Sequence, residues 1–152
     1  MAVTVGTVFT LQTQNSKEID TMANEVSLDS FDHVGMVVKN AEATAESWTK
    51  LLGVGPWRFT PGGAALKLAH AKMGGVMFEL LEPQEGQPSL WADFLASNGE
   101  GLHHVCTKVA DVEEATNKLE ADGGKVMIKM FPHMSYVSIG GPGSVIMELL
   151  KT

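Results

Sequence analysis

Apolar and polar positions change their period along the chain, and these changes predict alternating strands and helices. Phe31–Val38 is a compact apolar run with β-branched residues, which is typical of a strand. Over Ala41–Leu52, apolar side chains recur every three or four positions, which predicts an amphipathic helix. Asn40 is suited to cap the start of this helix and Gly53 to cap its end. We therefore expect the helix to fill the interval between them.

A β-hairpin is predicted after this helix. Two apolar runs, over residues 65–73 and 76–81, flank the pair Gly74-Gly75, which is suited to the turn between two paired strands. Gly55-Pro56 and Pro61-Gly62-Gly63 are turn signals between the helix and the hairpin. A linker over 83–88 and a short helix over 89–97 follow the hairpin. The second half is then predicted to contain a strand over 102–109, a helix that begins after Asp111 and stops at Gly123-Gly124, and strands over 125–130, 135–139 and 145–150.

Two motifs recur at nearly constant spacing, which indicates an internal repeat. His33-Val34 and His104-Val105 lie 71 residues apart, and Phe78–Leu81 and Met147–Leu150 lie 69 residues apart. Each half therefore reads as a strand, a helix and three strands, with a histidine in its first strand and a glutamate in its last. Halves of roughly 50 residues are too small to be stable alone, so we expect them to pack together.

Composition limits the classes of protein that this chain can represent. Its 152 residues, 44% hydrophobic and 19% charged, predict a globular protein, and no apolar run is long enough to span a bilayer. The net charge is −7 and Arg58 is the single arginine, which argues against a nucleic-acid surface. The single cysteine, Cys106, excludes an internal disulfide and a cysteine-based zinc site. A secretory signal begins with basic residues, and the first ten residues of this chain contain none. We therefore expect a soluble cytoplasmic protein.

Candidate chemistry lies in the repeated motifs. Glu79 and Glu148 each interrupt an apolar strand, where a carboxylate is costly unless it is paired or binds a metal. They occupy equivalent repeat positions, as do His33 and His104. Two imidazoles and two carboxylates suit a divalent ion such as Zn, Mn, Fe, Co or Ni. The sequence therefore predicts a metal site between the two halves.

A second histidine lies next to one of these candidates. His103 and His104 are neighbours in a predicted strand, so they should point to opposite faces. The repeat selects His104, because it precedes Val105 as His33 precedes Val34. We expect His103 at the surface or beside the ligands rather than among them. The substitution His103→Ala should then leave metal occupancy nearly intact.

Four segments carry a recognisable pattern: Phe31–Gly35, Phe78–Pro83, Gly99–Val105 and Ile146–Leu149. With them the chain resembles the vicinal oxygen chelate superfamily, which includes glyoxalase I, methylmalonyl-CoA epimerase and extradiol dioxygenases. The resemblance covers nearly all of the chain after the first 30 residues. It is greatest to the methylmalonyl-CoA epimerase-like members.

This resemblance implies an α+β fold. Two βαβββ modules would pack as one domain, and their strands would form an open curved sheet, or half-barrel, around a metal site. The modules would span 31–83 and 101–150, joined by a short helical linker over 84–100, and together they would form a single glyoxalase-like domain over 31–150. Residues 1–30 would precede it as a partly flexible extension, in which residues 1–11 alternate and could add an edge strand.

The resemblance also implies the metal ligands, which are His33, Glu79, His104 and Glu148. They would hold one divalent ion, Co, Ni, Mn, Fe or Zn. A six-coordinate ion with four protein ligands keeps about two positions open, where a substrate with two neighbouring oxygens can chelate. Extradiol dioxygenases use two histidines and one carboxylate, so the four-ligand set favours proton transfer over oxygen chemistry.

The activity implied is that of a metal-dependent isomerase or lyase, which abstracts a proton next to a chelated carbonyl, as methylmalonyl-CoA epimerase does. Glu148 would act as the base once it leaves the metal, as glutamates of this family can do. Related epimerases can carry a second catalytic glutamate on the strand over 65–73, but this strand has no acid here, and His70 is the candidate for the second acid or base. A glyoxalase I-type lactoylglutathione lyase and a metal-free binding or resistance protein are the alternatives. The expected partners are an acyl-CoA or a 2-oxo/thiol adduct and a second copy of the chain, with no nucleic acid and no membrane.

Overall fold

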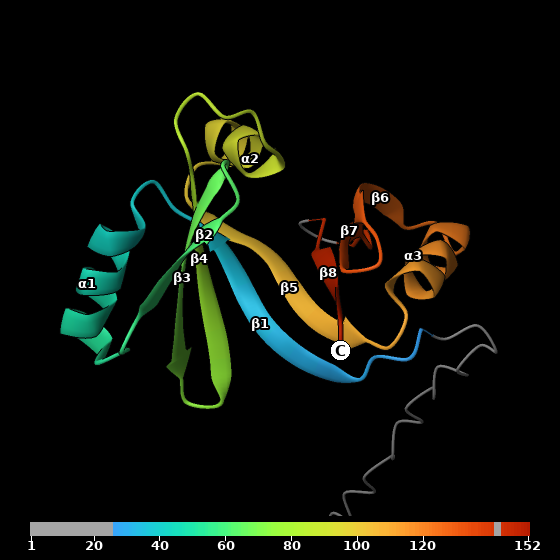
Figure 1. Ribbon diagram of the computed structural model, residues 1–152, viewed down its shortest axis with the longest axis horizontal. Helices are drawn as coiled ribbons and strands as arrows, with labels where there is room; N and C mark the ends of the chain where they lie inside the picture. The colour runs from blue at the N-terminus through green and yellow to red at the C-terminus, as the bar shows by residue number, and fades with distance from the viewer. Residues whose placement is uncertain (1–25, 142–143) are drawn as a thin grey trace, which may run out of the picture.

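One mixed sheet organises the molecule, and helices lie along its outer face (Figure 1). The computed structural model describes residues 26–141 and 144–152, and within them the chain forms eight strands and three helices. The elements in chain order are β1 (Ser30–Val37), α1 (Ala41–Leu52), β2 (Arg58–Gly62), β3 (Leu66–Met73), β4 (Val76–Pro83), α2 (Leu90–Asn98), β5 (Gly101–Val109), α3 (Val112–Ala121), β6 (Lys125–Met130), β7 (Met134–Ser138) and β8 (Ile146–Lys151).

The two halves of the sheet have the same internal arrangement. Outwards from the central β1–β5 pair, the strands run β1, β4, β3, β2 on one side and β5, β8, β7, β6 on the other. β1 pairs in parallel with β4, and β5 in parallel with β8, whereas β1 and β5 are antiparallel. This confirms the predicted α+β fold of two βαβββ modules in an open curved sheet.

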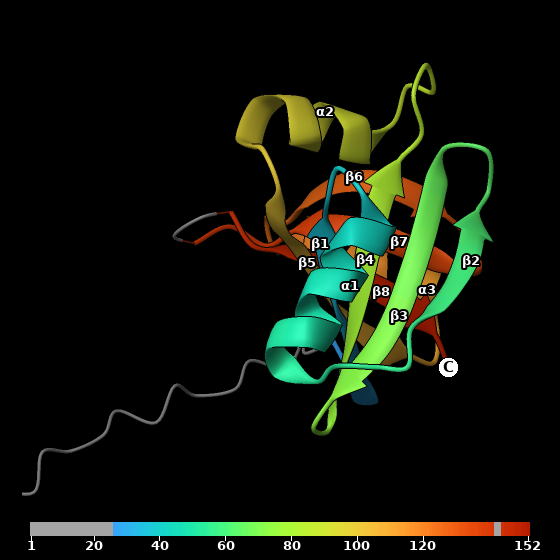
Figure 2. The same ribbon diagram turned by 90° about the vertical axis from the view of Figure 1, so that its left-hand side faces the viewer.

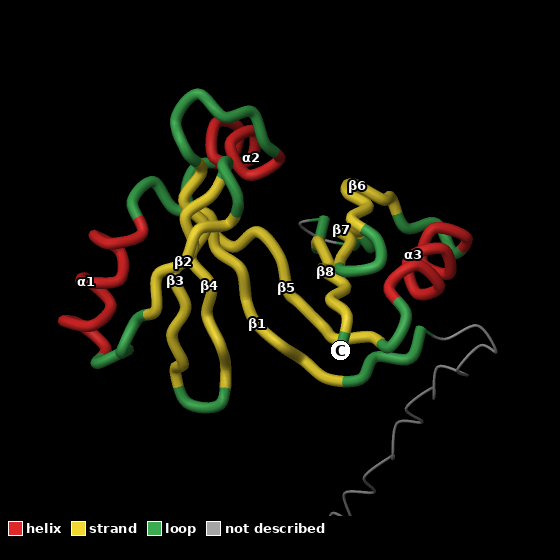
Figure 3. Tube along the Cα trace, in the orientation of Figure 1, coloured by secondary structure: helices red, strands yellow, loops and turns green. Residues whose placement is uncertain are grey.

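Helices α1 and α3 cover the outer face of the curved sheet and leave its inner face free for a site. α1 packs on β3 and β4, and α3 packs on β7 and β8, on opposite sides of the molecule (Figures 1 and 2). α2 contacts β4 and β1 at one end of the sheet (Figure 3). Small side chains allow α1 to approach closely, because Ala41 and Ala45 face Ala69 and Leu80 in one buried cluster.

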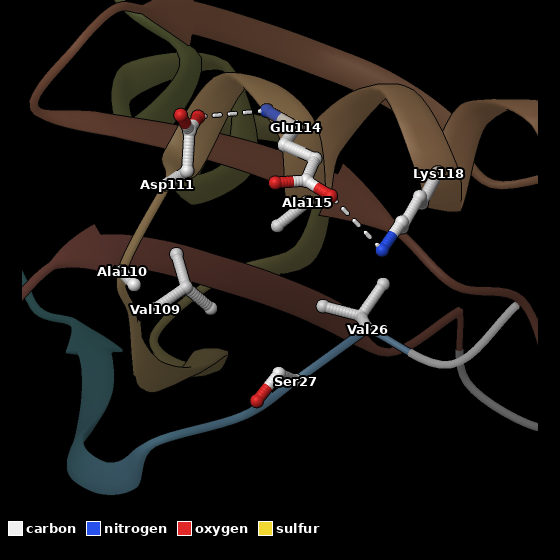
Figure 4. A pocket seen from close by; sticks show the side chains of 8 residues that line it. All are labelled: Val26, Ser27, Val109, Ala110, Asp111, Glu114, Ala115 and Lys118. Atoms are coloured by element: carbon white, nitrogen blue, oxygen red, sulfur yellow. Dashed lines mark hydrogen bonds and ion pairs between the residues drawn. The ribbon is translucent and has the colours of Figure 1, made fainter.

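Capping side chains start the helices where the sequence predicts. Asn40 Oδ1 accepts a hydrogen bond from the backbone N–H of Ala43 at 2.7 Å, and Asp111 Oδ1 accepts one from Glu114 at 2.9 Å. Figure 4 shows Asp111 at the start of α3, above a small pocket that Val26 also lines. Val26 packs against the apolar cluster under α3, so the segment before β1 is anchored to the second half of the sheet.

Strand β2 corrects the sequence interpretation. The pattern assigns Pro61 and Gly62 to a turn, but both residues close β2, and of that turn signal only Gly63 lies in the turn. Proline has no N–H to donate to a sheet ladder. Here it is tolerated because β2 is at the edge and pairs with β3 alone in the described part of the chain.

Some sequence expectations fall outside the described residues. These are the strand at residues 1–11, the extension over 1–30 as far as residue 25, and the centre of the turn between β7 and β8, at residues 142 and 143. Ser30, the last residue of the expected extension, is the first residue of β1. In the residues that are described, no helix has the length and apolar character needed to cross a membrane.

Candidate metal centre

Four buried side chains converge on the inner face at the middle of the sheet. His33 of β1, Glu79 of β4, His104 of β5 and Glu148 of β8 each offer one ligand atom, and these four atoms all lie within 4.8 Å of one another. Each residue is less than a tenth exposed. The structure thus brings together all four residues that the repeat selects from the sequence.

Strand register places the glutamates beside the histidines. Gly35 pairs with Glu79 across β1 and β4, and Cys106 pairs with Glu148 across β5 and β8. Gly35 and Cys106 each follow the histidine of their own module by two residues, and residues two apart on a strand share a face. Each glutamate therefore shares a face with the histidine of its module, and the β1–β5 pairing joins the two sets.

The interatomic distances fit a single cation. His33 Nε2 lies 3.1 Å from His104 Nε2 and 3.4 Å from Glu79 Oε2. Glu148 Oε2 lies 3.1 Å from both imidazole Nε2 atoms, but with no hydrogen-bond geometry to either. Ligand atoms at right angles around an ion, with bonds of about 2.1 Å, lie about 3.0 Å apart. The buried Glu148 oxygen, without a hydrogen bond, thus has the position of a metal ligand.

The electrostatics of the cluster favour positive charge at its centre. Burial raises the pKa of Glu79, but hydrogen bonds from two histidines outweigh this and lower it to about 2. Burial also raises the pKa of Glu148, and its contacts with His104 and His33 lower it below the ordinary value. The pKa of His33 is lowered by burial, yet contacts with Cys106 and both glutamates hold it well above its ordinary value. Both glutamates are therefore ionised at neutral pH.

The donor set suits the ions that the sequence predicts. Two imidazole nitrogens and two carboxylate oxygens, with no thiolate among the four, are ligands for Co, Ni, Mn, Fe or Zn. Two ionised carboxylates also balance the charge of a divalent ion. The four residues therefore fit a resident divalent metal.

Asp32 is placed to orient the first histidine. Its Oδ2 lies 2.9 Å from His33 Nδ1, and its Oδ1 lies 3.0 Å from Lys108 Nζ. The register between β1 and β5 skips Asp32, which is therefore the extra residue of a β-bulge. The hydrophobic pattern and the repeat do not point to Asp32, although its place directly before a candidate ligand histidine is a signal that could have found it.

His103 is buried beside His104 and is not one of the four clustered residues, so of the two places expected for it, the surface is excluded and the place beside the candidate ligands is found. It is 4% exposed, and its Nδ1 lies 2.9 Å from Nδ1 of His104. Strand alternation fails here because the β1–β5 register also skips His103, which makes a second bulge. Its ring lies edge-on to Phe94 of α2 and Tyr136 of β7. Burial and the neighbouring His104 lower the pKa of His103 to about 4, so it is neutral and can accept the Nδ1 proton of His104.

His70 reaches the cluster from β3. Its Nε2 lies 2.8 Å from Glu79 Oε1, whereas Glu79 Oε2 is the oxygen near the ligand histidines. The β3–β4 register pairs the two residues directly, which explains the contact. The other nitrogen, Nδ1, is buried and makes no hydrogen bond within the described residues. The structure therefore places the His70 imidazole against Glu79 Oε1, the carboxylate oxygen that is not shared with His33.

Comparisons with known proteins agree with this architecture. Residues 32–135 match the model of the Glyoxalase/Bleomycin resistance protein/Dioxygenase superfamily. An ethylmalonyl-CoA/methylmalonyl-CoA epimerase of Cereibacter sphaeroides is 31% identical over 100 residues, which are 64% of this chain and 73% of that protein.

Two solved structures share the fold. The methylmalonyl-CoA epimerase of Mycobacterium tuberculosis has a TM-score of 0.64 at 20% identity, and the match covers 86% of this chain and 92% of that protein. A variant of the Streptomyces coelicolor methylmalonyl-CoA epimerase, in complex with 2-nitronate-propionyl-CoA, has a TM-score of 0.65 at 24% identity and covers 83% of this chain and 99% of its own.

Proposed function

Because the chain belongs to the Glyoxalase/Bleomycin resistance protein/Dioxygenase superfamily, we propose that it is a divalent-metal-dependent epimerase of acyl-CoA thioesters. The observation that carries the proposal is the convergence of two buried histidines and two buried glutamates on one point of the inner face. The relative in Cereibacter sphaeroides, named an ethylmalonyl-CoA/methylmalonyl-CoA epimerase, supports the choice of reaction.

His33, Glu79, His104 and Glu148 would hold the metal. A divalent ion bound there would act as a Lewis acid on the carbonyl of the substrate. Its charge would weaken the C–H bond on the neighbouring carbon. Four protein ligands leave about two positions of a six-coordinate ion for the substrate. The protein contributes the remaining parts, which are orientation, exclusion of water and the groups that move the proton.

Glu148 is proposed as one proton acceptor. It is ionised, because its contacts with the two ligand histidines lower its pKa despite burial. It also lines the cavity that opens beside the cluster, so a substrate held there would lie against it. Once it has left the metal, an ionised carboxylate in contact with the substrate can accept a proton from the activated carbon.

His70 is proposed as the second acid or base, acting with Glu79. An epimerase must remove a proton from one face of a carbon and return one to the other face. Glu79 and Glu148 come from β4 and β8, on opposite sides of the central strand pair, so they approach the site from two sides. His70 Nε2, 2.8 Å from Glu79 Oε1, can supply the proton on its side or take it up.

Exchange of solvent deuterium into each epimer separates the two roles. With methylmalonyl-CoA as the probe, Glu148→Gln should abolish exchange out of one epimer, and His70→Gln should slow exchange out of the other at least tenfold. His133→Gln is the matched control, because His133 is exposed in the turn between β6 and β7 and belongs neither to the cluster nor to the lining of the cavity beside it. A metal-loaded wild-type protein that exchanges no deuterium into either epimer would contradict the proposed function.

A lyase of the glyoxalase I type is the second candidate, and one observation favours it. β3 carries no carboxylate, so the inner face lacks the second free glutamate expected of an epimerase. Turnover of the hemithioacetal of methylglyoxal and glutathione, in place of acyl-CoA exchange, would assign the chain to that reaction. A metal-free binding protein would instead show no metal in the purified protein.

The expected homodimer remains a prediction that light scattering at micromolar concentration can check.

A further inference from the structure

A second group of potential metal ligands lies beside the four-residue cluster. Asp32, His33 and Cys106 each offer one ligand atom, and these three atoms all lie within 4.8 Å of one another. Among the described residues, His33 is common to both groups, whereas Asp32 and Cys106 belong to the second alone. The second group contains a thiol, and sulfur is a softer ligand than imidazole nitrogen or carboxylate oxygen. The two groups therefore suit different cations.

The β-bulge at Asp32 brings the three side chains of the second group together. The β1–β5 register pairs His33 with Cys106 and skips Asp32. In a bulge, two successive residues of one strand lie opposite a single residue of its neighbour, so Asp32 and His33 both lie opposite Cys106. Regular alternation would instead direct Asp32 to the other face of the sheet, away from His33. The convergence is thus built into the register of the central strand pair.

The imidazole of His33 presents one nitrogen to each group. Its Nε2 lies 3.1 Å from Glu148 Oε2, on the side of the four-residue cluster. Its Nδ1 lies 2.9 Å from Asp32 Oδ2, on the side of the second group. Ligand atoms around a tetrahedral ion, with bonds of about 2.1 Å, lie about 3.4 Å apart. A small outward movement of Asp32 would therefore admit an ion in place of the proton between these two atoms.

The Cys106 thiol is available as a ligand. The residue is fully buried, and its Sγ contacts the His33 side chain. Within the described residues, Sγ makes one long hydrogen bond, 3.9 Å to the carbonyl oxygen of Thr107. A thiol is a weak hydrogen-bond donor, and a metal ion that coordinates it displaces its proton. Binding of an ion would thus disrupt little at this position.

Lys108 supports the second group electrostatically. Its Nζ lies 3.0 Å from Asp32 Oδ1, which leaves Oδ2 for an ion. A carboxylate, a thiolate and a deprotonated imidazole carry three negative charges, which a divalent ion and the Lys108 ammonium would together neutralise. The Asp32 side chain is 28% exposed, so an ion can enter from solvent and keep a water molecule as its fourth ligand.

We propose that Asp32, His33 and Cys106 form a second cation site, which takes a thiophilic divalent ion such as Zn²⁺ or Cd²⁺ and shares the His33 imidazole with the four-residue cluster. A single cysteine excludes a site made of cysteines, but here one thiolate acts with a nitrogen and an oxygen, a set that zinc-like ions accept. An ion at Nδ1 alters the strength of Nε2 as a ligand, so the two sites are coupled. The proposed epimerase function uses the four-residue cluster and does not require this second site.

Addition of Cd²⁺ to the full chain loaded with one equivalent of Co²⁺ tests the site. The visible spectrum of Co²⁺ reports on the four-residue cluster, and Cd²⁺ bound to a thiolate gives a charge-transfer band in the ultraviolet. We expect one Cd²⁺ per chain to bind with this band, to leave the Co²⁺ in place and to shift its spectrum through the shared imidazole. Elemental analysis after gel filtration counts both ions. Release of one Co²⁺ for each Cd²⁺ bound, or binding of Cd²⁺ without the thiolate band, overturns the proposal.

Two substitutions assign the Cd²⁺ to these residues. Cys106→Ser should remove the thiolate band and lower Cd²⁺ affinity by more than about 100-fold, beyond the usual effect of losing an outer-shell partner. Asp32→Asn, measured with saturating Co²⁺, should lower it by about tenfold. Asp93→Asn is the matched control, because Asp93 is exposed on α2 and outside both groups, and it should bind Cd²⁺ as the wild type does. Unchanged Cd²⁺ affinity in Cys106→Ser, with a native circular-dichroism spectrum, also overturns the proposal.

Titration of the metal-free chain separates this proposal from the proposed function. If the chain binds no Co²⁺ but Cd²⁺ gives the thiolate band, the proposed metal centre fails and the second site stands. If the Co²⁺-loaded chain exchanges deuterium into an acyl-CoA and Cd²⁺ gives no thiolate band, the proposed function stands and the second site fails.

Discussion

Asp32 and His103 occupy equivalent positions in the two halves of the molecule. Each is the extra residue of a β-bulge in the β1–β5 pair and directly precedes a histidine of the metal centre. Each also lies 2.9 Å from the Nδ1 atom of that histidine. A partner at Nδ1 fixes the proton of the imidazole there and leaves Nε2 free for a metal. The repeat thus supplies a support for each ligand histidine, a carboxylate in one half and a neutral imidazole in the other.

Removing either support should weaken metal binding. We expect Asp32→Ala and His103→Ala each to lower metal affinity about 10- to 100-fold, which is the usual effect of losing an outer-shell partner. The metal affinity of each variant can be measured by competition with a chromophoric chelator. Strand alternation alone predicts that His103→Ala leaves metal occupancy nearly intact. Because the bulge places His103 against His104, we now expect this substitution to weaken metal binding.

Exposed residues of the same types provide the controls. Asp93→Ala and His133→Ala remove an aspartate and a histidine that are exposed, and both variants should bind metal as the wild type does. If His103→Ala matched His133→Ala in affinity, the contact between the two Nδ1 atoms would have no role in holding the metal.

The candidate ligands could be selected from the sequence because they repeat. A glutamate in an apolar strand and a histidine before a valine each occur twice at nearly the same spacing, and the structure brings these four residues together. Asp32 and His103 could not be placed in the same way, since a bulge shifts the alternation of a strand by one residue and leaves no mark in the hydrophobic pattern. The repeat predicts three strands after the first helix, but the hydrophobic pattern does not locate β2, because its proline and glycine are typical of turns and are tolerated in a strand here at a sheet edge.

Gly35 should be essential for the metal centre. It pairs with His104 across β1 and β5, and a Cβ atom on residue 35 would overlap with three atoms of the His104 imidazole ring, Cε1, Nε2 and Nδ1. Gly35→Ala therefore forces the ring away, and we expect metal occupancy below a tenth of the wild-type value, measured by elemental analysis of the purified protein. Gly75→Ala is the control, because a Cβ there meets nothing within 4 Å. Full occupancy in Gly35→Ala would show that His104 is not a ligand.

Metal affinity should rise with pH. Although burial lowers the pKa of His33, its contacts with Cys106 and the two glutamates raise it well above the ordinary value, so His33 is protonated at neutral pH in the metal-free protein. A metal must displace this proton, and below the pKa of His33 each ion bound releases about one proton. Affinity should then increase about tenfold per pH unit between pH 6.5 and 8.5. Calorimetry in buffers of different ionisation enthalpy counts the protons, and a release near zero would contradict the prediction.

Metal binding should also stabilise the fold. An ion that binds only the folded chain adds about 2.7 kcal/mol at a concentration of 100 times its Kd, which should raise the Tm by roughly 5–10 °C for a protein of this size. Ca²⁺ at the same concentration should have little effect, since imidazole nitrogens are poor ligands for it. Glu79→Ala should lose the Co²⁺-dependent rise, whereas Glu46→Ala, at an exposed position of α1, should keep it. Differential scanning calorimetry with and without Co²⁺ measures each shift. An equal rise in both variants would place the stabilising ion somewhere other than the buried cluster, because Glu79 offers a ligand atom there and Glu46 does not.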